Sequence, residues 1–378
     1  IEPLVATDPA AAIKLAEYAL KRCDAAYGRV DDSGGELSIL MARAEAVHLD
    51  ACTAARPDPV TLARRLFQIE TTAGLDLLVD AYERYATVLG ETGATEYRRL
   101  ADAAWIDLDG RNTPSSTGPL RDFDHVERVR RVASILESVA RAERDIDRLV
   151  EVVGRSLETG YAYARLVRAL VDIDALDDAL AWTTRGLERH ANGRQIYEAA
   201  VDVHLARDER DAAIEHAWTL FAPGCSLTDL HRLLRCAPSD AARAELRDRA
   251  LQRARAVAEA HNRSTELVEL LVAEGFASEA LQATRTWPCG PQTALRAAQA
   301  NETSDPEAAA TVYLNLASHG VADATRRSYE RATQHLARAD ALLASNDGRR
   351  AFETAITEIR TNHERKRSLL AMLDERGW

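Results

Sequence analysis

The chain has 378 residues, enough for two or three ordinary domains or for one long array of repeats. Hydrophobic residues make up 46% of it, which excludes a disordered chain, and a formal net charge of −12 argues against a general electrostatic hold on nucleic acid. Aromatic residues make up only 5%, and alternating runs of strand length are scarce, so the composition predicts an all-α protein with a core of small aliphatic side chains.

The N-terminal part predicts a series of antiparallel helices. One helix begins at Asp8-Pro9 and extends to about Tyr27, because aspartate caps a helix and proline suits its first turn. Arg56-Pro57-Asp58-Pro59 stops one helix and starts the next, since proline is not tolerated inside a helix. We expect the other helices of this part at 36–55, 59–71, 74–90 and 93–107.

Residues 109–121 form a stretch of low hydrophobicity in which proline, glycine and serine cluster. Such a composition is typical of a linker. Helical periodicity resumes at about 123–143 and 145–158. The predicted organisation is therefore an N-terminal helical array at 1–108, a linker at 109–122, a repeat region at 123–320 and long C-terminal helices at 321–378.

Beyond the linker, residues recur at a spacing of 34. The pairs that share a position in a helical hairpin are Tyr163 with Tyr197, Val167 with Val201, and Ala179 with Ala213. This is the period of tetratricopeptide hairpins, which cannot bury their apolar faces alone and stack on neighbours. The helices expected are 160–173, 177–190, 194–207 and 210–222, a weaker hairpin at 226–259, and two long helices at 322–345 and 348–374. The predicted fold is an all-α, right-handed superhelix of antiparallel helical hairpins, a tetratricopeptide-like α-solenoid.

In such hairpins the first helix of each pair lines the inner surface, which holds a partner. The register places the following residues at exposed inward positions: Tyr161, Ala164, Arg168, Asp172, Gln195, Glu198, Asp202 and Leu205. The polar members and Tyr161 are the predicted partner-binding residues. Their mixture of arginine and acids suits a peptide of mixed or positive charge.

Two sets of histidine and cysteine residues raise the question of a metal site. His48 and Cys52 stand four residues apart on one predicted helix, and His216, Cys225, His231 and Cys236 surround a Pro-Gly turn. Neither set has the ligand number and spacing of a structural zinc site. A buried histidine beside a small apolar cysteine is the preferred interpretation of the first set, and we expect no metal.

Motifs of hydrolases, nucleotide-binding enzymes and metalloproteases are absent, so we expect a non-enzymatic protein without a cofactor. The acids Asp172, Asp174, Asp177 and Asp178 cluster at a turn between helices, where capping and helix-dipole roles are preferred over acid–base catalysis.

Two basic stretches are candidates for binding nucleic acid. They consist of Arg243, Arg247, Arg249, Arg253 and Arg255 in the first and Arg365-Lys366-Arg367 in the second. No aromatic platform accompanies either one, and acids interleave the first, which favours solvated helix faces. A nucleic-acid contact through the basic C-terminal helices stays the alternative.

Five widely spaced cysteines do not form a disulfide framework and suit a reducing cytoplasm, where we expect the protein. No run approaches the ~18 apolar residues of a transmembrane helix, so no membrane partner is expected. The chain begins with Ile1 rather than methionine, which favours a fragment or a trimmed product.

Three segments carry a family resemblance. They are Ala51-Cys52-Thr53-Ala54-Ala55-Arg56-Pro57-Asp58-Pro59 with the following Leu62-Ala63-Arg64-Arg65-Leu66-Phe67, then Tyr85-Ala86-Thr87-Val88-Leu89-Gly90 with Tyr97-Arg98-Arg99-Leu100-Ala101 and Trp105, and finally the closing stretch from His363 to Asp374. Together they resemble an uncharacterised bacterial family of helical-repeat proteins whose members often lie C-terminal to a SWIM-type zinc finger. The Cys-x-Cys and Cys-x-His pairs of such a finger are absent here, so no zinc ligand is assigned to this chain.

From the sequence we expect a helical-repeat scaffold that binds a protein or peptide on its concave face. The alternative is an accessory module of a SWIM zinc-finger protein that acts on nucleic acid.

Overall fold

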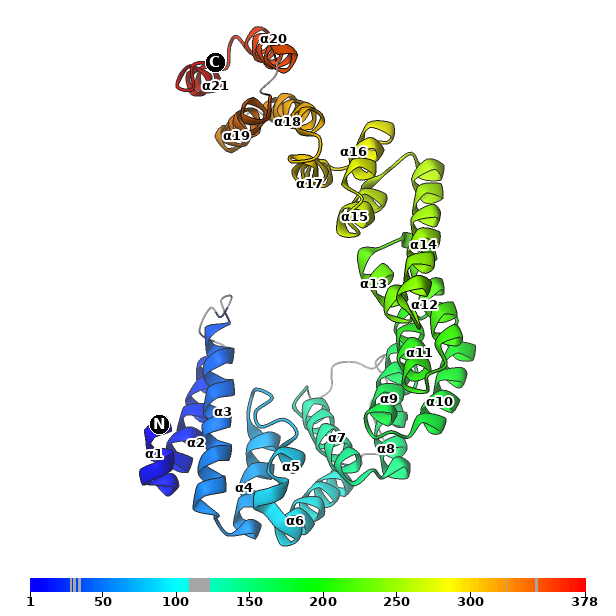
Figure 1. The fold of residues 1–378 in the computed structure, drawn as a ribbon. Coiled ribbons are helices and arrows are strands. Elements are labelled where there is room, and N and C mark those ends of the chain that lie inside the picture. Colours follow the sequence, from blue (N-terminus) through cyan, green and yellow to red (C-terminus); the bar gives the residue numbers. More distant parts are fainter. Residues whose placement is uncertain (28, 30–31, 33–34, 109–122, 324, 344–345) are drawn as a thin grey trace. The chain divides into compact units, whose positions relative to one another are not determined.

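The computed structural model describes the chain except for residues 28, 30–31, 33–34, 109–122, 324 and 344–345 (Figure 1). The described residues form α-helices joined by short turns and two 3₁₀ turns, and they contain no strand. The prediction of an all-α protein is therefore confirmed. The linker predicted at 109–122 lies outside the described residues.

The chain divides into two compact units, unit 1 from Ile1 to Arg207 and unit 2 from Asp208 to Trp378. The helices of unit 1 are α1 (Glu2–Thr7), α2 (Pro9–Tyr27), α3 (Glu36–Ala55), α4 (Pro59–Thr72), α5 (Ala81–Arg84), α6 (Ala86–Asp107), α7 (Phe123–Glu143), α8 (Ile146–Val153), α9 (Gly160–Asp172), α10 (Leu176–Arg189) and α11 (Arg194–Ala206).

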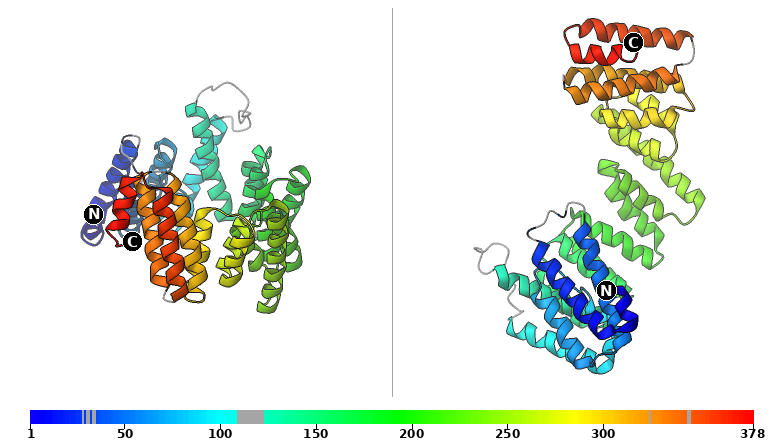
Figure 2. Two further views of the ribbon diagram at one scale, coloured as in Figure 1. Left: turned by 90° about the horizontal axis from the view of Figure 1, so that it is seen from above. Right: turned by 90° about the vertical axis from the view of Figure 1, so that its left-hand side faces the viewer.

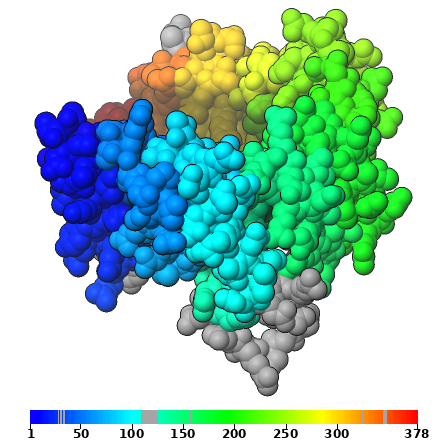
Figure 3. Space-filling view, turned by 90° about the horizontal axis from the view of Figure 1, so that it is seen from below, coloured from blue at the N-terminus to red at the C-terminus, as the bar shows by residue number. Residues whose placement is uncertain are grey.

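Within unit 1, the main packing is between helices that are adjacent or one apart in the sequence: α2 on α3, α4 on α6, α6 on α7, and α9 on both α10 and α11. The space-filling view shows these helices side by side in chain order (Figure 3). A buried hydrophobic cluster joins both sides of 109–122, because Trp105 and Leu108 belong to it together with Val129 and Leu136.

The helices of unit 2 are α12 (Arg210–Gly224), α13 (Leu227–Arg235), α14 (Asp240–His261), α15 (Thr265–Ala273), α16 (Ala277–Thr286), α17 (Pro291–Asn301), α18 (Pro306–Gly320), α19 (Arg326–Leu342), α20 (Asn346–Asn362) and α21 (Arg367–Asp374). Here too, sequence neighbours pack together. The two C-terminal helices form a layer on the pair α18 and α19 (Figure 2).

Local sequence signals place several helix starts. Asp8 accepts a hydrogen bond from the backbone N–H of Ala11, and Asp58 accepts one from Thr61, so both aspartates cap the helices that begin at the prolines after them. The helices predicted at 36–55 and 123–143 are confirmed, and those at 160–173 and 177–190 are confirmed to within one residue.

The helix predicted at 74–90 is wrong. The chain from Ala73 to Asp80 is irregular, and Leu78 and Asp80 adopt positive φ angles of 57° and 60°. Carboxylates from earlier helices replace the helical hydrogen bonds, since Asp24 accepts from the N–H of Leu75 and Glu45 from that of Leu78. This irregular stretch buries Leu78 completely.

Two further expectations need correction. The helix expected at 145–158 ends at Val153 and continues as a 3₁₀ turn, Gly154–Ser156. The long helix expected at 348–374 is broken between α20 and α21. At the break, Lys366 Nζ donates a hydrogen bond to the carbonyl oxygen of Val321 at 2.8 Å. The break lets Leu369 and Leu373 turn into the core, where both are fully buried.

The core of unit 1 contains one carboxylic acid without an ion pair. Glu70 on α4 is 8% exposed and accepts hydrogen bonds from the hydroxyl of Tyr97 and, at 3.4 Å, from the backbone N–H of Ala81. Burial raises the pKa of Glu70 from 4.5 to about 8, and these hydrogen bonds only partly oppose the shift.

We therefore expect Glu70 to make the protein lose stability as the pH rises from about 4.5 to about 8. In this window the unfolded chain releases the proton that the folded chain still holds. Glu70→Gln removes this dependence while keeping an acceptor for Tyr97. Urea unfolding at pH 5 and pH 8 measures the effect: the free energy of unfolding should fall less between the two values in the variant than in the wild type. Equal losses would contradict the assignment.

Candidate functional site

The exposed side of α9 carries the first half of the predicted partner-binding residues. Tyr161 is 61% exposed, and Arg168 and Asp172 follow it at intervals of seven and eleven residues, which places all three on one helix face. The opposite face is buried through Tyr163, Leu166, Val167 and Leu170. Ala164, which we expected on the exposed face, is fully buried in this core, so that expectation is wrong.

The second half lies on α11. Ile196, Ala199, Ala200 and Val203 turn into the core, which leaves Gln195 exposed and Glu198, Asp202 and Leu205 partly exposed. The neighbouring α10 approaches closely because it has a glycine at the contact. A Cβ added at Gly186 would lie 2.8 Å from Ile196 Cδ1 and 3.1 Å from Tyr163 Cβ. Close packing of this kind holds α9 and α11 beside each other.

Ion pairs connect these helices across their exposed sides. Glu198 Oε1 lies 3.1 Å from Arg194 Nε, and Glu198 Oε2 lies 3.7 Å from Arg168 Nη2. On the other side of Arg168, Arg165 pairs with Glu137 of α7. The exposed residues of α9 and α11, together with the largely buried Glu137 of α7, therefore form one surface. We call it the α7–α9–α11 face, and it consists of Glu137, Tyr161, Arg165, Arg168, Asp172, Arg194, Gln195, Glu198 and Asp202.

Sequence reasoning did not include Glu137, Arg165 or Arg194 in this surface. Arg165 could have been found, because it lies four residues after Tyr161 and three before Arg168 and so shares their face. Glu137 precedes the first 34-residue repeat, and only the packing of α7 on α9 shows that it belongs to the surface.

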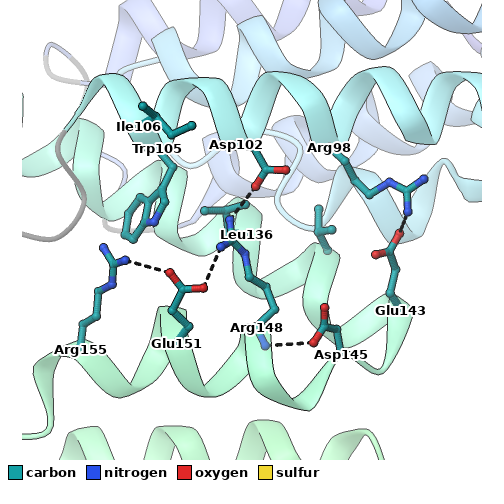
Figure 4. Close-up of a pocket in the computed structure, with 11 residues that line it drawn as sticks. Arg98, Asp102, Trp105, Ile106, Leu136, Glu143, Asp145, Arg148, Glu151 and Arg155 are labelled. Atoms are coloured by element: carbon teal, nitrogen blue, oxygen red, sulfur yellow. Dashed lines mark hydrogen bonds and ion pairs between the residues drawn. The ribbon is translucent and has the colours of Figure 1, made fainter.

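A cavity of about 710 Å³ lies between α6, α7 and α8, and its lining is shown in Figure 4. Its apolar part contains Trp105, Ile106, Leu136 and Val139. The guanidinium of Arg155 lies 4.3 Å from the centre of the Trp105 ring, which is a favourable cation–π distance.

The charges of this cavity are paired with one another. Arg98 pairs with Glu143 at 2.6 Å, Arg148 bridges Asp102 and Glu151 at 2.6 and 2.8 Å, and Arg155 binds Glu151 at 3.1 Å. The remaining acid, Asp145, caps α8 through the backbone N–H of Arg148. No histidine, cysteine, serine or threonine lines the cavity. These contacts tie α8 to α6 and α7.

The chain matches the model of a family described as "Family of unknown function (DUF6880)" over residues 1–371. It belongs to the DUF6880 family. A search of curated proteins gives no match. The match agrees with the resemblance to an uncharacterised family, whereas the link to SWIM zinc fingers and the tetratricopeptide character of the repeats stay predictions.

The DUF6880 chain has a buried polar cluster around His48, the first residue considered for a metal site. His48 is fully buried, its Nδ1 lies 2.7 Å from the hydroxyl of Tyr85, and its Nε2 lies 3.7 Å from Glu17 Oε1. Burial opposes ionisation of Glu17, but His48 and Arg65 outweigh it and lower the pKa of Glu17 to about 2. The result is a network of satisfied polar groups that joins α2, α3, α4 and Tyr85, the residue before α6.

Cys52 lies against this cluster, with its Sγ 3.9 Å from both ring nitrogens of His48. Burial, and then the negative charge of Glu17, raise the pKa of the Cys52 thiol to about 12. The thiol is therefore protonated at neutral pH, which makes it a poor nucleophile.

The second histidine and cysteine set does not converge either. Cys225 and Cys236 are buried, whereas His231 is exposed. Among the described residues, no group of three His, Cys, Asp or Glu side chains is placed to hold a metal ion. Nor does any helix of the described part have the length and apolar character needed to cross a membrane.

The acidic turn after α9 does not cap α10 in the expected way. The N-cap residue is Ala175, which has no capping side chain, and Asp174 adopts a positive φ of 64° in the turn. Asp177 and Asp178 lie in the first turn of α10, where their negative charges interact favourably with the positive end of the helix dipole. The capping prediction is therefore wrong, and the dipole prediction agrees with the placement.

The arginines of α14 all have internal partners. Arg249 covers the ring of Trp218 at 4.0 Å, Arg255 pairs with Glu279, and Arg247 lies over Phe276. Arg253 and Arg243 donate to backbone carbonyl groups of Ala222 and Leu234. In the C-terminal stretch, Lys366 likewise binds a carbonyl group. These contacts give the arginines of α14 structural roles, whereas Arg365 and Arg367 of the C-terminal stretch are exposed.

We expect Cys52 to react much more slowly with iodoacetamide than Cys23, which is partly exposed. Alkylation needs a thiolate that the reagent can reach, and Cys52 offers neither condition in the folded protein. Mass spectrometry of peptides after timed labelling of the native protein measures both rates, and labelling in urea provides the control. Equal rates in the native protein would show that the thiol is accessible and activated.

Proposed function

We propose that this DUF6880 chain is a non-enzymatic scaffold that binds a segment of a partner protein on the α7–α9–α11 face. In this proposal the helical hairpins stack as a right-handed, tetratricopeptide-like superhelix, and the first helix of each pair lines its concave side. A cytoplasmic location fits the scattered free cysteines.

The observation that carries the proposal is Tyr161. Tyr161 is 61% exposed, and it lies one helical turn from Arg165 and two turns from Arg168. Tyrosine and arginine are enriched among the residues that dominate binding energies at protein interfaces. Tyr161 offers apolar area and a hydroxyl at little cost in side-chain entropy.

The charges around Tyr161 favour a partner segment of mixed or positive charge. The arginines Arg165, Arg168 and Arg194 are bridged by Glu137 and Glu198, so their charge is largely compensated within the face. Asp172 and Asp202 add further negative charge along the same helices. Complementary charges of this kind steer a partner and fix its register more than they add affinity.

We expect Tyr161→Ala to lower the recovery of the principal partner about tenfold or more, since loss of a central interface residue typically costs ~2 kcal/mol. The full chain serves as bait in cells that produce it naturally, with quantitative mass spectrometry as the readout. Tyr18→Ala is the matched control, because Tyr18 is a tyrosine of α2 that is 62% exposed and lies outside the face.

Equal recovery with the two tyrosine variants would contradict the proposal. Recovery that nuclease treatment abolishes would favour the alternative, an accessory module of a SWIM zinc-finger protein that acts on nucleic acid through the basic C-terminal helices.

A further inference from the structure

Unit 2 contains a groove of about 900 Å³ in which α18 lies next to both α17 and α19. Its apolar lining includes Pro288, Pro291, Leu295, Val312 and Leu316. The volume is within the range of sites that bind ligands of drug or short-peptide size. The groove does not involve the α7–α9–α11 face, which belongs to unit 1.

The charged residues that line the groove are all basic or potentially basic. Arg285 lies in the last turn of α16, His319 near the end of α18, and Arg331 and His335 one turn apart on α19. Among the residues that the structure describes, no aspartate or glutamate lines the groove. This is a local excess of positive charge on a chain with a formal net charge of −12.

The two arginines have unmet bonding capacity. In the part of the chain that the structure describes, neither Arg285 nor Arg331 forms an ion pair with a carboxylate. Both are exposed, and Arg331 faces His335 on its own helix, whose pKa is lowered by burial and then by the charge of Arg331. The cavity of Figure 4 shows the opposite arrangement, since each of its arginines is bound by a carboxylate.

Polar groups that can orient a ligand surround the arginines. His319 Nδ1 donates to the backbone carbonyl of Asn315 at 2.8 Å, which leaves Nε2 for another partner. The N-terminus of α17 begins at Pro291 with no capping side chain and no acid in its first turn. Its positive end adds to the attraction that the arginines exert on an anion.

We propose that this groove binds an acidic segment of a partner protein, with its carboxylates on Arg285 and Arg331 and its apolar side chains against Leu295, Val312 and Leu316. Carboxylates meet the unpaired guanidinium groups through charge-assisted hydrogen bonds. Apolar side chains of the partner segment pack against the part of the groove that has no charged lining residues. A nucleic acid fits less well, because no tryptophan, tyrosine or phenylalanine lines the groove to stack on a base.

Selection from a random linear-peptide display library on the immobilised full chain tests this inference. We expect the enriched peptides to combine aspartate or glutamate with leucine, isoleucine or valine. The double variant R285A/R331A should weaken their binding about tenfold or more, since a hydrogen bond to a charged group contributes ~1.5–3 kcal/mol. Affinities of the enriched peptides are measured by fluorescence anisotropy at two salt concentrations, and the higher one should weaken binding.

Arg327→Ala is the matched control, because Arg327 is an exposed arginine of α19 that does not line the groove. It should leave the affinities unchanged, and so should Tyr161→Ala, which separates this inference from the proposed function. Circular dichroism of all variants checks that they fold.

Three results would overturn the inference. The first is a selection that yields no peptides, or only peptides without acidic residues. The second is a double variant that binds the enriched peptides as tightly as the wild type does. The third is an Arg327→Ala variant that weakens peptide binding as much as the double variant does. A single-stranded oligonucleotide that displaces the peptides and depends on the same two arginines would assign the groove to nucleic acid instead. Self-association that the double variant abolishes would assign it to a second copy of the chain.

Discussion

The candidate site depends on close contact between helices whose crossing points carry alanine or glycine. Gly186 of α10 leaves room for Ile196 of α11 and Tyr163 of α9, and Ala164 and Ala199 are fully buried in the same core. Larger side chains at these points would push the helices apart or force neighbours out of their rotamers. Because the buried faces fit so closely, the opposite faces of α9 and α11 are presented together, and their polar residues can act as one surface.

The protein uses its many arginines in two different ways. Around α6, α7 and α8 the arginines are bound by nearby carboxylates, which neutralises the charge and ties the helices together. Pairs of this kind contribute little individually to stability when they are exposed. In the described part of unit 2, Arg285 and Arg331 form no ion pair with a carboxylate, so their charge is available to a ligand. The unpaired arginines distinguish the groove of unit 2 from the cavity between α6, α7 and α8, and also from the α7–α9–α11 face, whose arginines pair with Glu137 and Glu198.

Several features of the fold followed from the sequence because they depend on local physics. The spacing of 34 residues located α9, α10 and α11, and aspartate followed by proline located the starts of α2 and α4. The chain between Ala73 and Asp80 could not be predicted in this way. Its backbone groups are satisfied by Asp24 and Glu45, which lie far away in the sequence.

The candidate site was only partly predictable for the same reason. Tyr161, Arg168 and Asp172 share a helix face by periodicity alone, which the sequence shows. Periodicity also suggested Ala164, but the burial of that residue is decided by the packing of α9 within its core. Arg165 pairs with Glu137, which lies 28 residues earlier in the sequence on another helix. This pair can be seen only once α7 and α9 are placed side by side.

Hydrogen–deuterium exchange of the full chain carrying Gly186→Leu tests most directly whether the shared packing of α9, α10 and α11 creates the α7–α9–α11 face. A leucine at this position meets Ile196 and Tyr163, which belong to the two other helices. The account predicts faster exchange in α9, α10 and α11 together, because the three helices lose their packing as one cooperative unit. Faster exchange confined to α10, with α9 and α11 protected as in the wild type, would contradict it.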